Sequence, residues 1–223
     1  MTAWCVGFDL SLRFPAAVAL PCNWRPGDWK AVRAWLLKTK APEDSSDVIG
    51  QMNRYLEISK WAIGLVESLY SRSQRMTNVR SLRASAVMHL YVEDYGYSKN
   101  NKSAAHMMES GGIVRADIWR RFGLTMTNVS VTHARKLVFG FNPRKPAYDP
   151  KVFIQDTVFN KFKAPKTWGE NECDALLVAQ AGLSELGGLI LTLQRTAKKE
   201  RKGVKEKVSE SVKRKLPRKS RRP

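Results

Sequence analysis

The sequence predicts an α/β protein with a mixed, five-stranded β-sheet flanked by helices. Its 223 residues, 43% of them apolar, are enough for one domain with a sizeable core. Several short apolar runs bounded by Gly, Ser or Pro are typical of buried strands. These runs come before and between longer segments with apolar residues at helical spacing, an order that is typical of a sheet covered by helices.

The first half of the chain is expected to hold three strands and a long helix. Strands near residues 3–9 and 14–20 would form a hairpin, and residues 31–37 would add a third strand. Polar residues then precede a segment whose apolar side chains keep helical spacing to about Tyr70. Residues 72–83 are basic and irregular, which fits either a solvated loop or an exposed extension of that helix.

The second half alternates strands with helices. Apolar runs predict strands at 87–97 and 126–131. Helical spacing predicts helices at 103–121, from Thr132 onward, at 151–162 and at 167–186, with a last apolar piece at 189–193. Thr167 and Glu170 have the spacing of a capping box, which would open the last long helix.

Positive charge is concentrated at the end of the chain. The sequence has 39 Lys and Arg against 20 Asp and Glu, a net charge of +19. Residues 195–223 carry 14 of these cations and 3 Glu, and they contain no aromatic residue. We therefore expect a folded domain at 1–194 and a basic, disordered tail at 195–223. The tail is either a phosphate-gripping arm or a solubilising segment, and counterion release favours the arm.

Composition also restricts the partners and the compartment. A strongly basic chain is attracted to polyanions, with nucleic acid as the first candidate and an anionic membrane surface as the second. The three cysteines form no CxxC pair and no zinc pattern, which is typical of a reducing, intracellular protein. No secretory signal and no membrane-spanning run is expected, so we predict a soluble, cytoplasmic protein, or a nuclear one if its host has a nucleus.

Three acidic residues share a pattern that points to metal chemistry. Asp9 and Glu93 each end an apolar strand, and Asp174 lies early on an otherwise apolar helix. A buried acid is costly unless it is paired or binds a metal, although for Asp9 taken alone the start of a turn is the more common explanation. If the two strands are neighbours and the helix crosses them, the carboxylates converge. Two Mg²⁺ ions held there would activate a water and stabilise the leaving oxygen in phosphodiester cleavage.

This constellation resembles the RuvC-type Holliday junction resolvases of the ribonuclease H-like superfamily. The matching segments appear in the family's order over roughly residues 3–186: Gly7-Phe8-Asp9-Leu10-Ser11, Tyr91-Val92-Glu93-Asp94-Tyr95, Ser103 to Val114, and Asn171-Glu172-Cys173-Asp174-Ala175-Leu176. The basic tail lies outside this resemblance. The resemblance implies a ribonuclease H-like fold and a symmetric homodimer that cuts two strands.

The resemblance also implies a role for each acid. Asp9 would bridge two metal ions, Glu93 would bind one of them and Asp174 the other. The family usually has a further acid or histidine three residues before its last Asp, and here that position is Asn171, a weaker ligand. Glu170 shares a helical face with Asp174 and could substitute, unless it serves the capping box instead. Glu172 is expected to point away into solvent.

Contacts to DNA are expected from cations and aromatic side chains near these acids. Lys136, next to Arg135, resembles a basic position of the family that contacts DNA or the scissile phosphate, and Lys151 is a second candidate. A solvated helix surface explains these cations as well. Tyr95 and Tyr97 would stack on opened bases at a junction centre, or would simply be buried at the end of a strand.

The predicted activity is Mg²⁺-dependent cleavage of four-way DNA junctions by paired nicks, with Mn²⁺ as a possible substitute for Mg²⁺. Two alternatives remain at this stage. One is a ribonuclease H-like nuclease that acts on flaps, forks or RNA–DNA hybrids. The other is a non-catalytic, basic DNA-binding protein whose acids are structural.

Overall fold

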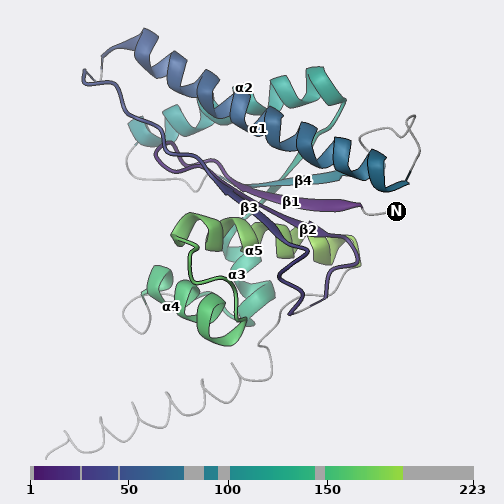
Figure 1. Ribbon diagram of the computed structural model, residues 1–223. Coiled ribbons are helices and arrows are strands. Elements are labelled where there is room, and N and C mark those ends of the chain that lie inside the picture. Colours follow the sequence, from purple (N-terminus) through teal and green to yellow (C-terminus); the bar gives the residue numbers. More distant parts are fainter. Residues whose placement is uncertain are drawn as a thin grey trace, which may run out of the picture.

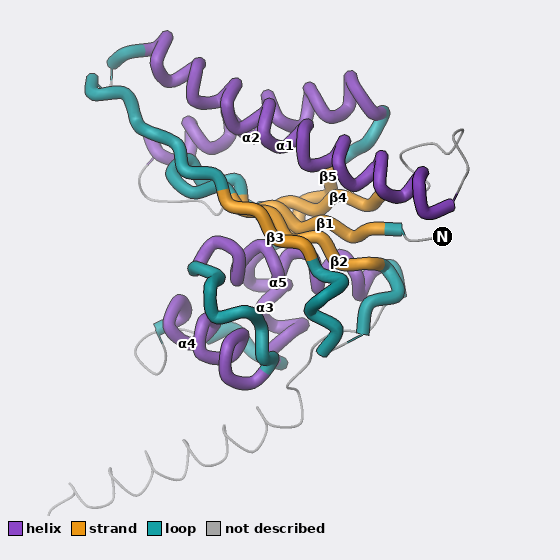
Figure 2. The backbone as a smooth tube through the Cα atoms, in the orientation of Figure 1, coloured by secondary structure: helices purple, strands orange, loops and turns teal. Residues whose placement is uncertain are grey.

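A computed structural model describes residues 3–25, 27–44, 46–77, 88–94, 101–143 and 149–187. Its centre is a mixed, five-stranded sheet with the order β3-β2-β1-β4-β5. Figures 1 and 2 show this sheet between two layers of helices, with α1 and α2 on one side and α3, α4 and α5 on the other. The α/β class and the mixed sheet predicted from the sequence are confirmed.

The strands follow the predicted apolar runs closely. Their bounds are β1 Trp4–Asp9, β2 Ala16–Pro21, β3 Arg33–Leu36, β4 Met88–Glu93 and β5 Met126–Val129. The first two pair as the expected antiparallel hairpin, and β3 extends it. In contrast, β1 pairs with β4 in parallel, and β4 pairs with β5 in parallel. The carboxyl ends of these three strands therefore meet at one edge of the sheet.

Alternation along β1 sends its side chains into two separate cores. Trp4, Val6 and Phe8 pack with α1 Val48–Thr77 and α2 Asn101–Phe122, whereas Cys5 packs against α5 Glu170–Glu185. Almost every side chain of β1 is buried on one face or the other, as expected for a strand covered on both sides. The central position of β1 explains why its last residue, Asp9, lies amid several elements.

Some element bounds differ from the prediction for local reasons. The helix α1 continues to Thr77, so residues 72–77 extend the helix and are not a loop. Ser130 caps α3 Val131–Phe139 by accepting the His133 N–H, so the helix begins one residue earlier than expected. The helix expected at 151–162 consists of α4 Pro150–Asp156 and a π-helical turn, η2 Thr157–Lys161.

Several sequence-based expectations fall outside the described residues. These are the apolar piece at 189–193, the basic tail at 195–223 and the aromatic residues Tyr95 and Tyr97. Among the described residues, no helix combines the length and the apolar character that crossing a membrane requires.

Candidate active site

The backbone brings two of the acids side by side at the carboxyl edge of the sheet. The parallel pairing of β1 with β4 runs in register from Trp4 opposite Met88 to Phe8 opposite Val92. Asp9 and Glu93 are the next residues on each strand and end them. Because parallel strands in register project corresponding side chains to the same face, the two carboxylates are neighbours.

The third acid reaches this edge because α5 packs unusually close to the sheet. A Cβ atom on Gly7 would lie 2.3 Å from both the Ala175 carbonyl oxygen and the Ala179 backbone nitrogen. A Cβ atom on Gly182 would overlap the Tyr91 ring in the same way, at 2.2 Å. Two glycines at the helix–sheet interface thus allow close backbone approach. Asp174 directly precedes Ala175 on α5, so this close packing holds it at the edge where Asp9 and Glu93 lie.

Burial and neighbouring acids raise the pKa of all three carboxylates. Burial raises the pKa of Asp9 well above its ordinary value, and Glu93 and Asp174 raise it further, while the Ser11 N–H lowers it. Burial and then Asp174 raise the pKa of Glu93 to about 7. Burial raises the pKa of Asp174 to about 6, against the opposing effect of Arg135. Crowded, desolvated acids of this kind are typical of functional sites.

Asp9 also begins a turn, as the simpler interpretation of the sequence held. Its Oδ1 atom accepts the backbone N–H of Ser11 at 3.0 Å. This contact fixes the side chain and favours the ionised form, since a carboxylate accepts hydrogen bonds better than a carboxylic acid does. Turn formation and membership of the acid cluster are therefore compatible roles for one residue.

The two neighbouring cations on α3 differ in position. Arg135 is partly buried and lowers the pKa of both Glu93 and Asp174, so its guanidinium lies close to the acids. Its Nε atom is buried without a hydrogen-bond partner among the described residues. Lys136 is exposed on the same helix. The contact of Lys136 with DNA stays a prediction, and Arg135 is the α3 cation whose charge acts on the carboxylates.

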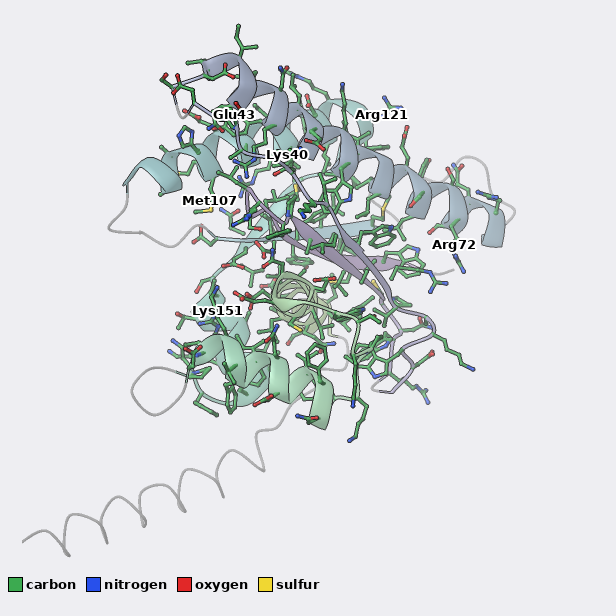
Figure 3. The ribbon with its side chains drawn as sticks, turned by 60° about the vertical axis from the view of Figure 1, so that its left-hand side comes forward. Lys40, Glu43, Arg72, Met107, Arg121 and Lys151 are labelled. Carbon is green, nitrogen blue, oxygen red and sulfur yellow. The ribbon has the colours of Figure 1, made fainter. Side chains whose placement is uncertain are left out.

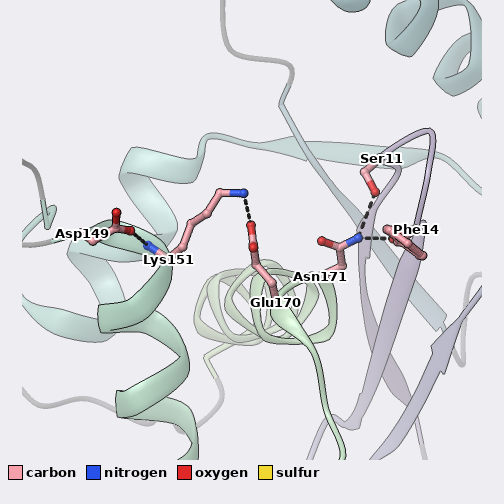
Figure 4. A network of polar contacts seen from close by, with 6 residues as sticks. All are labelled: Ser11, Phe14, Asp149, Lys151, Glu170 and Asn171. Carbon is pink, nitrogen blue, oxygen red and sulfur yellow. Dashed lines mark hydrogen bonds and ion pairs between the residues drawn. The ribbon is translucent and has the colours of Figure 1, made fainter.

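The beginning of α5 is tied to two other segments, as Figure 4 shows. Lys151 forms an ion pair with Glu170, and its charge also lowers the pKa of Asp174. Asn171 donates its side-chain amide to Ser11 Oγ, at 3.1 Å, and to the Phe14 carbonyl oxygen. Both contacts lie beside the acids but have different consequences. Glu170 adds negative charge to the cluster, whereas the Asn171 amide nitrogen is used to anchor the β1–β2 hairpin.

Two expectations about this helix start are wrong. The capping residue is Gly169, not Thr167, so Glu170 is the first residue of the helix and has no part in a capping box. Glu172, expected in solvent, is 7% exposed, and its Oε2 atom accepts the Gly169 N–H at 3.0 Å. A glycine offers no side-chain signal for an N-cap, so the Thr-x-x-Glu spacing was the stronger but misleading pattern.

The donor set fits a divalent cation. Within the described residues, no three His, Cys, Asp or Glu side chains stand close enough together to enclose a metal ion as placed. Mg²⁺ does not require such an enclosure, because it binds through one or two carboxylates and keeps several waters. The cluster provides hard oxygen donors, and a cation would offset the burial and the neighbouring negative charge that raise the pKa of Asp9, Glu93 and Asp174.

Comparison with known proteins identifies the fold. No protein-family model matches the sequence, and no curated protein sequence matches it either. Two similar solved structures are Thermus thermophilus RuvC and T. thermophilus RuvC in complex with Holliday junction substrate, each with a TM-score of 0.53 and 13% sequence identity. The first match covers 84% of this chain and 98% of the RuvC chain, and the second covers 83% and 96%. The chain thus has the ribonuclease H-like fold of these RuvC structures.

Proposed function

We propose that this protein is a Mg²⁺-dependent endonuclease that resolves four-way DNA junctions by paired nicks. The observation that carries the proposal is the convergence of Asp9, Glu93 and Asp174 from three elements at one edge of the sheet, where Glu93 and Asp174 add to the effect of burial in raising the pKa of Asp9. Such crowding of carboxylates destabilises a metal-free protein. A site of this kind is therefore better explained by cation binding than by structural stability.

Each side chain of the cluster has a proposed part. Asp9 would be shared between two Mg²⁺ ions, with Glu93 and Asp174 each holding one of them, and Mn²⁺ could substitute. When bound, the metal ions would supply charge stabilisation and a reactive water for phosphodiester hydrolysis. Arg135 favours the ionised forms of Glu93 and Asp174, the forms that bind a cation. Glu170 is the better candidate for the fourth acidic position, because the Asn171 amide is engaged with the hairpin.

The proposed substrate rests on charge and on the shared fold. A net charge of +19 favours binding to a polyanion such as DNA. A similar structure is that of T. thermophilus RuvC in complex with Holliday junction substrate, which makes a four-way junction the first substrate to test. Symmetric cleavage of a junction requires two active sites, so we also propose a homodimer. Light scattering with and without junction DNA tests the dimer directly.

The deciding experiment compares labelled four-way junction, fork, linear duplex and RNA–DNA hybrid, each with Mg²⁺ and with a chelator. We expect Mg²⁺-dependent cleavage of the junction above all other substrates and no cleavage by Asp9→Asn, which should still bind DNA. Asp94→Asn is the matched control, because Asp94 is exposed and lies just outside the cluster. Equal cleavage of all substrates would refute junction resolution alone. Full activity of Asp9→Asn would refute the metal site.

A further inference from the structure

A concave site lies at the opposite end of β1 from the acids. This basic pocket is a cavity of about 650 Å³ between the start of β1, the β2–β3 loop and the end of α1. Trp4, the first residue of β1, forms part of its wall, whereas Asp9 ends the same strand. Figure 3 shows Arg72 of the pocket and Lys151 of the acid site on opposite sides of the molecule.

Three exposed cations from different segments gather at the basic pocket. Arg25 and Lys30 come from the β2–β3 loop, and Arg72 comes from α1. The acidic residue in the lining is Asp28, and no described acid forms an ion pair with any of the three cations. Like charges that converge from separate parts of a chain repel one another, so their approach indicates a site for an anion.

Hydrogen bonds hold these segments together. The Trp4 indole N–H donates to Ser73 Oγ at 3.0 Å, which ties the end of α1 to the start of β1. In the loop, the Trp24 indole N–H donates to the Asp28 carbonyl oxygen at 3.0 Å. Arg33 donates to the Lys30 carbonyl oxygen at 2.8 Å. These hydrogen bonds therefore fix the positions of the segments that carry the cations of the pocket.

The lining of the basic pocket favours phosphate over bases. Trp4 and Trp24 are only 3% and 2% exposed, and both indole N–H groups already have partners, so neither ring offers a surface for base stacking. The groups left for a ligand are the cations and Asn23, which is exposed at the rim. Lys and Arg without stacking aromatics are typical of sequence-independent contacts to a nucleic-acid backbone.

We propose that the basic pocket binds the sugar-phosphate backbone of a duplex arm of the DNA substrate, away from the cleaved bond. This inference deepens the proposed function, since it assumes that the acid edge acts on DNA. The five residue steps from Trp4 to Asp9 along β1 separate the pocket from Asp9 by about 17 Å, at roughly 3.3 Å per step. At about 3.4 Å per base pair, a duplex must extend at least about five base pairs beyond the cut to reach it.

The test measures how DNA affinity depends on salt, in a chelator so that cleavage plays no part. We compare wild type with the double variant Lys30→Gln/Arg72→Gln on a duplex of about 30 base pairs, roughly three helical turns. Each lost phosphate contact lowers the slope of log K against log salt by about 0.9, so the double variant should lose about 1.8. The matched control, Lys60→Gln/Arg120→Gln, removes two exposed cations elsewhere and should leave the slope close to wild type.

Two further outcomes separate this inference from its competitors. An unchanged slope in Lys30→Gln/Arg72→Gln, with an unchanged melting temperature, overturns it. Tripolyphosphate binding that this variant loses, while its DNA slope stays at the wild-type value, also overturns it and assigns the pocket to a small phosphate compound. Because no cleavage is measured, a reduced slope supports the pocket even if the protein cuts no junction, and junction cleavage with an unchanged slope supports only the proposed function.

Discussion

The Glu93 carboxyl group at the end of β4 raises the pKa of the Asp9 carboxyl at the end of β1, adding to the larger effect of burial. Two acids held this close repel each other whenever both are ionised. This repulsion lowers the free energy of unfolding. Groups of residues that lower stability in this way are typical of functional sites.

Neutralising one of these acids should stabilise the metal-free protein. We expect Glu93→Gln to raise the free energy of unfolding at neutral pH by about 1 kcal/mol, the equivalent of roughly one pKa unit, because burial and the Asp174 charge both disfavour an ionised group at this position. The melting temperature in a chelator should rise by about 2–4 °C. Cleavage should be lost. Asp94→Asn, which removes an exposed charge next to the cluster, should change neither the melting temperature nor cleavage. A lower melting temperature for Glu93→Gln would contradict the prediction.

Stability of the metal-free protein should fall as pH rises through the acid cluster. Folding raises the pKa of Glu93 from 4.5 to about 7 and that of Asp174 from 3.8 to about 6, in both cases chiefly through burial. The native state therefore binds more protons than the unfolded state between about pH 4 and pH 7, and the stability present below the unfolded pKa values is lost as pH rises through the folded ones.

Calorimetry in a chelator tests this pH dependence. The melting temperature of Glu93→Gln relative to wild type should increase from about pH 5 to pH 8, because only the wild type carries the ionising group. The difference between the two proteins cancels effects of other titrating groups. Saturating Mg²⁺ should reduce the difference at the higher pH, and a difference that stays constant with pH would count against the raised pKa of Glu93.

The contact between Gly7 and α5 should be intolerant of a methyl group. In Gly7→Ala the new Cβ atom meets backbone atoms of Ala175 and Ala179, which cannot rotate away. We expect a loss of about 1–3 kcal/mol or more in unfolding free energy, typical of overpacking. Because α5 carries Asp174, the displaced helix should also raise the Mg²⁺ concentration needed for half-maximal cleavage.

Gly64→Ala is the control for this substitution. Gly64 lies within α1, and a Cβ atom there would meet nothing within 4 Å. The change should stabilise the protein by up to about 1 kcal/mol, the difference in helix propensity between Ala and Gly. Thermal unfolding and Mg²⁺ titration of the two variants in parallel separate the close approach at Gly7 from a general effect of removing glycine. Equal behaviour of the two variants would contradict the close-packing explanation.

Substitutions of Glu170 and Asn171 should affect different properties, the cleavage rate for Glu170 and the stability for Asn171. Glu170→Gln removes a charge that raises the pKa of Asp9, and it should slow cleavage at least about tenfold, a loss typical of ligand-shell residues. Its melting temperature should change little. Asn171→Ala removes hydrogen bonds to Ser11 and Phe14, and it should lower stability by about 1 kcal/mol while the folded protein still cleaves. The opposite result would make Asn171 the fourth active-site residue.

Arg135 and Lys136 should differ in their effects on the pH profile. Arg135 lowers the pKa of Glu93 and Asp174, so Arg135→Gln should move the acidic limb of the cleavage profile toward higher pH. Lys136→Gln removes an exposed cation, so it should weaken DNA binding and its salt dependence without moving that limb. Rates measured at saturating DNA across the pH range distinguish the two. If both variants gave the same pH profile, the electrostatic role proposed for Arg135 would be wrong.

Local sequence patterns determined the elements and the candidate acids. Runs of apolar residues bounded by turn formers located β1, β2 and β4, because a strand buried on both faces needs such a run. The edge strands β3 and β5 are partly exposed, but they too lie within the predicted ranges. Asp9 and Glu93 stood out because a carboxylate at the end of such a run is unusual. Element ends were less predictable, as the glycine cap of α5 shows, since Gly169 has no side chain to signal its role.

Only the tertiary structure decided which residues meet. Asp9, Glu93 and Asp174 are far apart in the chain, and their approach depends on the pairing of β1 with β4 and on the glycine contacts of α5. The same holds for Arg135 at the acids and for Arg72 beside the β2–β3 loop. Hydrophobic periodicity carries information over a few residues, whereas adjacency follows from the packing of whole elements around a shared core.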